Sequence, residues 1–138
     1  MNASRFVSRI ALSATVLGCV FAAAPIASAA DAISFNPGSP WTQTVGNVSK
    51  TDNFHEYLVN ASAGKTLQIN LVTKNPNVYF SVMPAQSHKT LIDTRTTGDT
   101  TWSTRIAMAG SYTVRVYEDA DVTPSGEQTK YALQVGMY

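Results

Sequence analysis

The stretch YLVNASAGKTLQINL at residues 57–71 decides the fold class of this chain. Its apolar side chains recur at every second position on both sides of a glycine turn: Tyr57, Val59 and Ala61 before it, and Leu67, Ile69 and Leu71 after it. A period of two puts such a row on one face of a β-strand. The stretch therefore predicts two neighbouring strands, each with one buried face, joined by a turn at Gly64.

The same alternation recurs along most of the chain. Further inward rows are predicted at Tyr112, Val114 and Val116, at Tyr131, Leu133, Val135 and Met137, and less regularly at Trp102, Thr104 and Ile106. Residues 78–83 form a short apolar run typical of a strand inside a sheet, residues 33–35 and 45–48 indicate short opening strands, and no window has a helical stripe. Short strands between Gly and Pro turns favour two sheets packed face to face. We expect an all-β fold: one antiparallel β-sandwich domain of about eight strands at residues 30–138.

The first 29 residues have the features of a secretory signal peptide. Arg5 and Arg9 give a positive start, residues 10–24 are apolar, and Ala27-Ser28-Ala29 supplies an A-x-A cleavage site. No later apolar run approaches the roughly 18 residues that a membrane-spanning helix needs. The sequence predicts a periplasmic or secreted protein without a membrane span.

Cys19 is the only cysteine of the 138 residues and lies within the predicted signal peptide. Cleavage after Ala29 leaves no thiol for a disulfide, a metal or a nucleophile. The alternative is that residues 16–19, Val-Leu-Gly-Cys, act as a lipobox and make Cys19 a lipid-anchored first residue.

Charge and composition exclude several function classes. The mature chain keeps eight basic residues against nine acidic ones, so charge predicts no nucleic-acid partner. His55 and His88 are far apart in sequence, and no carboxylate pair has the apolar surroundings of a general acid and base. Asp119, Asp121 and Glu127 offer oxygen ligands, but without the EF-hand pattern that would indicate calcium. We expect no enzyme activity, no metal and no cofactor.

Several short motifs, in order and spacing, resemble the periplasmic inhibitors of g-type lysozyme. They are Phe-Asn-Pro-Gly at residues 35–38, Gly-Asn-Val at 46–48, the stretch at 57–71, Tyr79-Phe80, and Ala-Gly-Ser-Tyr at 109–112, followed by a long loop and Tyr131. The resemblance covers residues 35–135. It implies a β-sandwich that inhibits a peptidoglycan-cleaving lysozyme, with lysozyme as its protein partner.

In that family the loop before the last strand enters the lysozyme cleft, which implies a role for residues 118–129 here. This loop has twelve residues, whereas most hairpin loops have about two to five. The family's loop carries two arginines four residues apart; Ala120 and Pro124 take their places, and Thr51 takes that of a contacting tyrosine. Since glycosidase clefts present carboxylates, an acidic loop without arginines would be repelled.

The resemblance predicts a partner-binding site at this loop and at a neighbouring turn. Its residues are Thr51, Asp52, Glu118, Asp119, Ala120, Asp121, Thr123, Pro124, Ser125 and Glu127. The alternative function is a cell-envelope or carbohydrate-binding module without inhibitory activity. In that case Trp41, Tyr79, Phe80 and Trp102 would form an aromatic platform on one sheet face.

Overall fold

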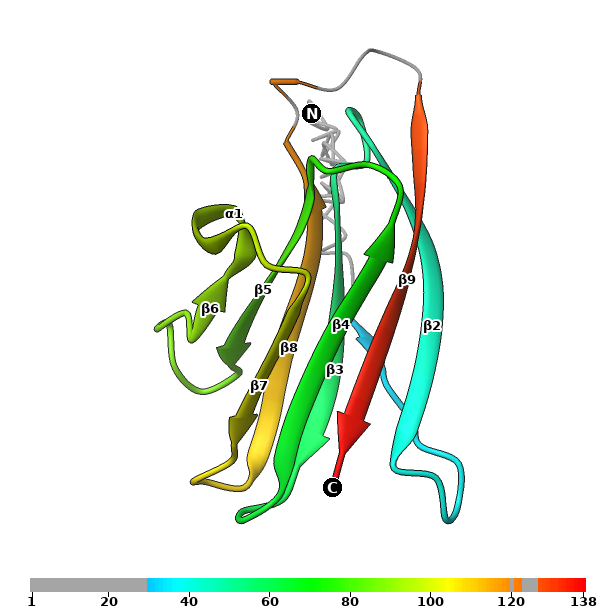
Figure 1. The fold of residues 1–138 in the computed structure, drawn as a ribbon. Helices are drawn as coiled ribbons and strands as arrows, with labels where there is room; N and C mark the ends of the chain where they lie inside the picture. The colour runs from blue at the N-terminus through cyan, green and yellow to red at the C-terminus, as the bar shows by residue number, and fades with distance from the viewer. Residues whose placement is uncertain (1–29, 120, 123–126) are drawn as a thin grey trace, which may run out of the picture.

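Two sheets of strands pack face to face in the structure, a computed structural model that describes residues 30–119, 121–122 and 127–138 (Figure 1). The first sheet has the order β1 (Asp31–Ala32), β3 (Phe54–Ala61), β8 (Gly110–Glu118), β5 (Val78–Pro84) and β6 (Ile92–Asp93). The second has the order β2 (Trp41–Ser49), β9 (Gln128–Met137), β4 (Thr66–Thr73) and β7 (Thr101–Arg105). All pairs are antiparallel except β1 with β3. The predicted all-β sandwich is confirmed, with nine strands among the described residues.

The core lies between the sheets and consists of the alternating rows. Rows from β3, β5 and β8 of one sheet meet rows from β4 and β9 of the other. Val59, Leu67, Ile69, Val114 and Leu133 are fully buried. Each such side chain stabilises the fold by roughly 1.5–3 kcal/mol relative to an exposed one. The inward rows predicted from the period of two are therefore confirmed on these strands.

Two local predictions are corrected by the structure. The first strand is Asp31–Ala32 rather than residues 33–35; Ile33 only donates one backbone hydrogen bond, 2.8 Å long, to Leu58 and packs against the core. A one-turn helix, α1 (Thr94–Thr97), also lies after β6. Its cap is local: the Asp93 carboxylate accepts from the Arg95 N–H, and Gly98 ends it with φ 76°. One turn is too short to show a helical stripe, so the period could not reveal it.

A buried tyrosine pair joins the two sheets. The hydroxyls of Tyr57 on β3 and Tyr131 on β9 lie 2.5 Å apart, and both side chains are almost fully buried. Gly46 on β2 leaves the room for them, because a Cβ there would stand 2.4 Å from the Tyr131 hydroxyl oxygen. Burial first, and then the hydrogen bond from Tyr57, raise the pKa of Tyr131 well above its ordinary value.

Within the described ranges, no helix has the length and apolar character needed to cross a membrane. The predicted signal peptide at residues 1–29, with Cys19, lies outside the described residues.

Candidate functional site: the loop end of the sandwich

Three connections meet at one end of the sandwich, at the top of Figure 1. They are residues 50–53 between β2 and β3, residues 74–77 between β4 and β5, and residues 119–127 between β8 and β9; together we term them the loop end. Backbone hydrogen bonds tie them to one another: the Glu118 N–H donates to the Asn53 carbonyl (2.8 Å) and the Asp119 N–H to the Asn77 carbonyl (3.1 Å). The predicted partner turn and the long loop are thus brought together.

Glu118 does not point to solvent. Its side chain is only 2% exposed, and its Oε1 accepts hydrogen bonds from Asn75 Nδ2 (2.7 Å) and Thr129 Oγ1 (3.0 Å). Its Oε2 is buried with no hydrogen-bond partner among the described residues. Glu118 continues the row of Tyr112, Val114 and Val116 at every second position, so the alternation of β8 itself directs it inward. Glu118 is therefore a buried, hydrogen-bonded residue beneath the loop end and not part of its exposed surface.

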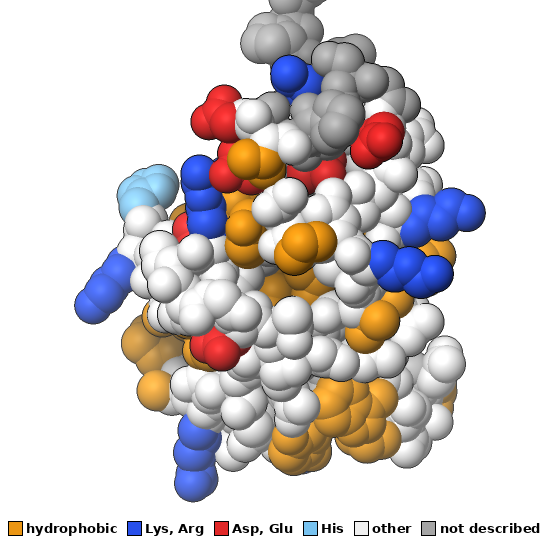
Figure 2. Space-filling model, turned by 45° about the horizontal axis from the view of Figure 1, so that its top comes forward, with side chains coloured by type: hydrophobic (Ala, Val, Ile, Leu, Met, Phe, Trp, Pro, Cys, Tyr) orange, Lys and Arg blue, Asp and Glu red, His pale blue; other side chains and the backbone are white. Residues whose placement is uncertain are grey.

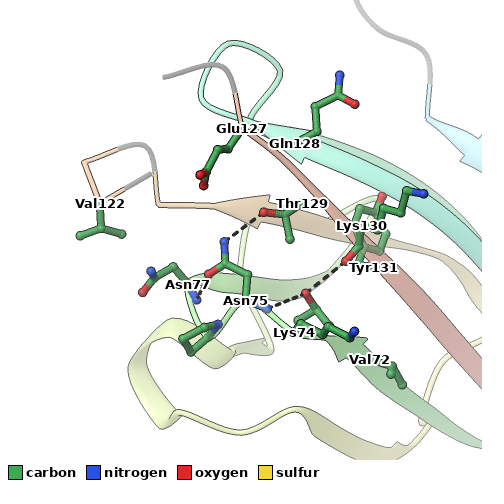
Figure 3. A pocket seen from close by; sticks show the side chains of 12 residues that line it. Val72, Lys74, Asn75, Asn77, Val122, Glu127, Gln128, Thr129, Lys130 and Tyr131 are labelled. Atoms are coloured by element: carbon green, nitrogen blue, oxygen red, sulfur yellow. Dashed lines mark hydrogen bonds between the residues drawn. The ribbon is translucent and has the colours of Figure 1, made fainter. Parts of the chain in front are cut away.

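Asn75 connects Glu118 to the neighbouring strand and turn. Besides its bond to Glu118, its Nδ2 lies 3.0 Å from Thr129 Oγ1 at the start of β9. Its Oδ1 accepts from the Asn77 N–H (2.9 Å), and its own N–H donates to Thr73 Oγ1 (3.2 Å) (Figure 3). One asparagine side chain thus links β8, β9 and the 74–77 turn.

An open hollow of about 900 Å³ lies at the loop end. Figure 3 shows its walls: residues 72–77 on one side, and Val122 with residues 127–131 on the other. Asn75 and Thr129, which hold Glu118, are among these residues. The hollow is large enough to receive side chains of a protein partner.

Arg95 from α1 reaches the base of the long loop, which sequence reasoning missed. Its Nη2 lies 2.9 Å from Asp119 Oδ2. The two residues are 24 positions apart, so no short-range motif connects them. The only local signal is the Asp93 cap and Gly98 around α1, which indicate an ordered turn but not its neighbour.

Cations of neighbouring elements offset part of the negative charge of the loop end. Leaving out the buried Glu118, its three connections carry Asp52, Asp119, Asp121 and Glu127 against Lys50 and Lys74, and Arg95 of α1 and Lys130 of β9 lie beside them. Figure 2, turned so that this end comes forward, shows acidic side chains gathered near it with basic ones beside them. The repulsion expected from the acidic loop sequence is reduced by cations that other elements supply.

The predicted partner-binding residues divide into three groups. Thr51, Asp52, Asp121 and Glu127 are exposed at the loop end. Glu118 is buried, and Asp119 is mostly covered and paired with Arg95. Ala120, Thr123, Pro124 and Ser125 lie outside the described residues.

The histidines occupy two separate places. His55 Nε2 lies 3.4 Å from Asp52 Oδ2, and His88 is exposed in the connection after β5. Across the ranges that the structure describes, no group of three or more His, Cys, Asp or Glu side chains is placed to hold a metal ion.

The four predicted platform aromatics do not share a face. Phe80 is fully buried, and Trp102 packs against the core. Tyr79 lies on β5 beside Tyr117, whereas Trp41 lies on β2 of the other sheet and is 39% exposed. The prediction of one platform formed by these four residues is wrong, because Phe80 and Trp102 pack in or against the core and the other two lie on different sheets.

No family model and no curated protein matches the chain by sequence. Solved structures do match it. PliG of Aeromonas hydrophila, a periplasmic lysozyme inhibitor of g-type lysozyme, is 22% identical with a TM-score of 0.68, over 79% of this chain and 96% of that one. PliG of Salmonella Typhimurium, also a periplasmic lysozyme inhibitor of g-type lysozyme, is 12% identical with a TM-score of 0.60, over 78% of this chain and 96% of that one. The pre-peptidase C-terminal domain of a Bacillus anthracis collagenase is 13% identical with a TM-score of 0.55, over 81% and 97%. The resemblance to the PliG inhibitors predicted from short motifs is confirmed at the level of the fold.

Proposed function

We propose that this protein is an exported inhibitor of a peptidoglycan-cleaving lysozyme, of g-type by resemblance, and that the loop end blocks the enzyme's cleft. The observation that carries the proposal is the loop end itself. A sandwich with the fold of the PliG inhibitors presents a long β8–β9 connection, flanked by two turns, at one end. Periplasmic or secreted localisation and lysozyme as the partner belong to the same proposal.

The mechanism is steric. Residues 119–127 enter the cleft, with Thr51 and Asp52 of the neighbouring turn making contact beside them. Both ends of the loop are held: Glu118 by Asn53 and Asn75, and Thr129 by Asn75 and Glu118. A loop with fixed ends loses less conformational entropy when it binds, which favours affinity. Pro124 is expected to restrict the loop tip further.

Cations at and beside the loop end make contact with an acidic cleft feasible although the arginines of the inhibitor family are replaced. Glu118 is withdrawn from the surface, and Arg95 offsets Asp119. Lys74 and Lys130 line the same hollow as Glu127. A cleft carboxylate therefore meets cations from the 74–77 turn, α1 and β9 as well as the loop acids.

The test is inhibition of purified g-, c- and i-type lysozymes by the mature domain, residues 30–138. One variant has residues 120–126 replaced by a short glycine linker. The expected result is inhibition of at least one lysozyme, lost in the linker variant while its thermal midpoint is kept. A matched control is Thr113→Ala, on the outer face of β8 away from the loop end. No inhibition of any of the three classes at micromolar protein refutes the proposal.

A further inference from the structure

The outer face of the four-stranded sheet carries an ordered arrangement of side chains that the proposed function does not use. The strand register places three rows across β2, β9 and β4: Trp41, Gly136 and Gln68; Gln43, Gln134 and Asn70; and Val45, Ala132 and Val72. Successive rows are about 7 Å apart, since alternate strand residues lie two rises apart. None of these side chains is charged.

The middle row, which we term the amide row, is a continuous hydrogen-bonded line. The Thr101 hydroxyl of β7 donates to Asn70 Oδ1 (2.8 Å), Asn70 Nδ2 donates to Gln134 Oε1 (2.7 Å), and Gln134 Nε2 donates to Gln43 Oε1 (3.0 Å). Side chains from all four strands are therefore held in place on an exposed face.

The amide row keeps hydrogen-bonding capacity for an external ligand. Each amide NH₂ has two N–H donors and each amide oxygen two lone pairs. The line uses one donor each of Asn70 and Gln134, and one lone pair of each amide oxygen. Because the line already fixes the side chains, a ligand would gain these hydrogen bonds with little ordering cost.

An aromatic pair borders the amide row on the side that faces away from the loop end. The rings of Trp41 and Tyr138 lie 5.9 Å apart between centroids, and the Tyr138 hydroxyl donates to Gln68. Trp41 lies over Gly136, where a Cβ would come within 2.8 Å of its ring carbons. A glycine inside a strand often marks such a close approach. Trp41 and Tyr138 are still 39% and 50% exposed, so the pair presents a fixed aromatic surface to solvent.

A hollow of about 390 Å³ joins Trp41 to the amide row. Trp41, Thr42, Gln43 and Gln134 line it. On the other side of the amide row lies the row of Val45, Ala132 and Val72, in which both valines are strongly exposed. A ligand on this face thus meets an aromatic ring, then amides, then small apolar groups.

We propose that this face is a binding site for an uncharged glycan of β-1,4-linked N-acetylhexosamines. The apolar C–H face of a pyranose ring stacks on an aromatic ring, and Trp41 offers that platform. The substituents on the edge of such a ring reach towards the amide row, about 7 Å away, where the acetamido group pairs with protein amides. Further sugars of the chain extend over the row of Val45, Ala132 and Val72. The three rows carry no charged side chain, so this part of the face complements a neutral ligand.

The glycan site adjoins the loop end at one residue, since Val72 also lines the hollow of the loop end. The aromatic pair and the amide row lie further along β9, which begins at Gln128 near the loop end and ends at Met137 near Tyr138 (Figure 1). The proposal is independent of lysozyme inhibition, and the linker variant of the β8–β9 loop should bind glycan like the unmodified domain.

The probe is chitohexaose, with cellohexaose as the matched sugar without acetamido groups. Trp41 and Trp102 are the only tryptophans, so Trp102→Phe makes Trp41 the sole tryptophan reporter. We expect chitohexaose to shift Trp41 fluorescence with a dissociation constant at or below about 1 mM, and cellohexaose to bind at least about tenfold more weakly. Calorimetry of Trp41→Ala and Gln134→Ala, each with its thermal midpoint measured, should show at least about tenfold and threefold weaker binding. Thr113→Ala, on the other sheet, should bind unchanged.

Three results overturn the proposal. The first is no binding of chitohexaose at about 10 mM, well above the expected dissociation constant. The second is unchanged binding by a folded Trp41→Ala variant, and the third is equal binding of cellohexaose. Sedimentation of the domain gives a further check: self-association that Trp41→Ala abolishes would assign this face to a second copy of the chain instead.

Discussion

Asn75 should be the most sensitive single position of the loop end, and Asn75→Ala tests this. The substitution removes the 2.7 Å hydrogen bond to the buried Glu118 carboxylate, the contact with Thr129, and the bond from the Asn77 N–H. A hydrogen bond to a charged group contributes roughly 1.5–3 kcal/mol, and a local side chain–backbone bond about 0.5–1.5 kcal/mol. The expected loss in the free energy of unfolding is about 2–4 kcal/mol.

Urea denaturation measures that loss. With a slope of roughly 1.5–2 kcal/mol per molar for a domain of this size, the midpoint should fall by about 1–3 M. Asn60→Ala is the matched control: Asn60 is exposed on β3 and accepts one bond from Ser111, so its loss should stay within about 0.5 kcal/mol.

A double variant separates the buried charge from simple loss of contacts. Glu118→Gln keeps the shape of the side chain but removes its charge. If an under-satisfied buried carboxylate causes the loss, Asn75→Ala should cost clearly less in the Glu118→Gln background. An equal loss in both backgrounds, or a loss under about 1 kcal/mol for Asn75→Ala alone, refutes the reasoning.

Three further predictions concern the tyrosine pair and the loop salt bridge. Gly46→Ala should destabilise the fold by about 1–3 kcal/mol, because its Cβ would stand 2.4 Å from the Tyr131 hydroxyl. The measurement is a lower thermal midpoint. Burial and the Tyr57 hydrogen bond raise the pKa of Tyr131, so its neutral form contributes stability that is fully present below pH about 10 and is lost at higher pH. Thermal midpoints should thus fall above pH 10, and an unchanged midpoint from about pH 9 to 12 contradicts this. Arg95→Ala should cost under about 1 kcal/mol, since Arg95 itself is exposed, yet weaken lysozyme inhibition because Asp119 loses a counter-charge; unchanged inhibition contradicts that role.

The strand framework was predictable because burial on one face leaves a direct trace in the sequence. Leu67, Ile69 and Leu71 repeat at the period of the pleat, and the structure buries all three. The opening strand and α1 were not predictable in the same way. A two-residue strand and a one-turn helix depend on hydrogen bonds to neighbours, such as Ile33 with Leu58, rather than on a periodic pattern.

The candidate site was predictable in position but not in electrostatics. The sequence predicted the long β8–β9 loop and a turn near Thr51 beside it, and the structure places both at one end. The loop was predicted to expose all its acidic side chains. Glu118, however, occupies an inward position in the alternation of β8 and is buried, and the sequence pattern of that strand already indicated this. The Arg95 contact joins residues 24 positions apart, so only the folded topology could reveal it.

The pairing of β2 with β9 has a kinetic consequence. Trp41 pairs with Gly136, so the four-stranded sheet joins residues from near the two ends of the described chain. β9 also lies between β2 and β4, so the edges of β2 and β4 that face each other have no strand partner until β9 docks. Sheets dominated by such distant pairings fold in roughly milliseconds to seconds, far more slowly than helical bundles. A chain that is exported before it folds would gain time from this order of events: the half of the sandwich that carries the amide row can assemble only after the last strand has emerged.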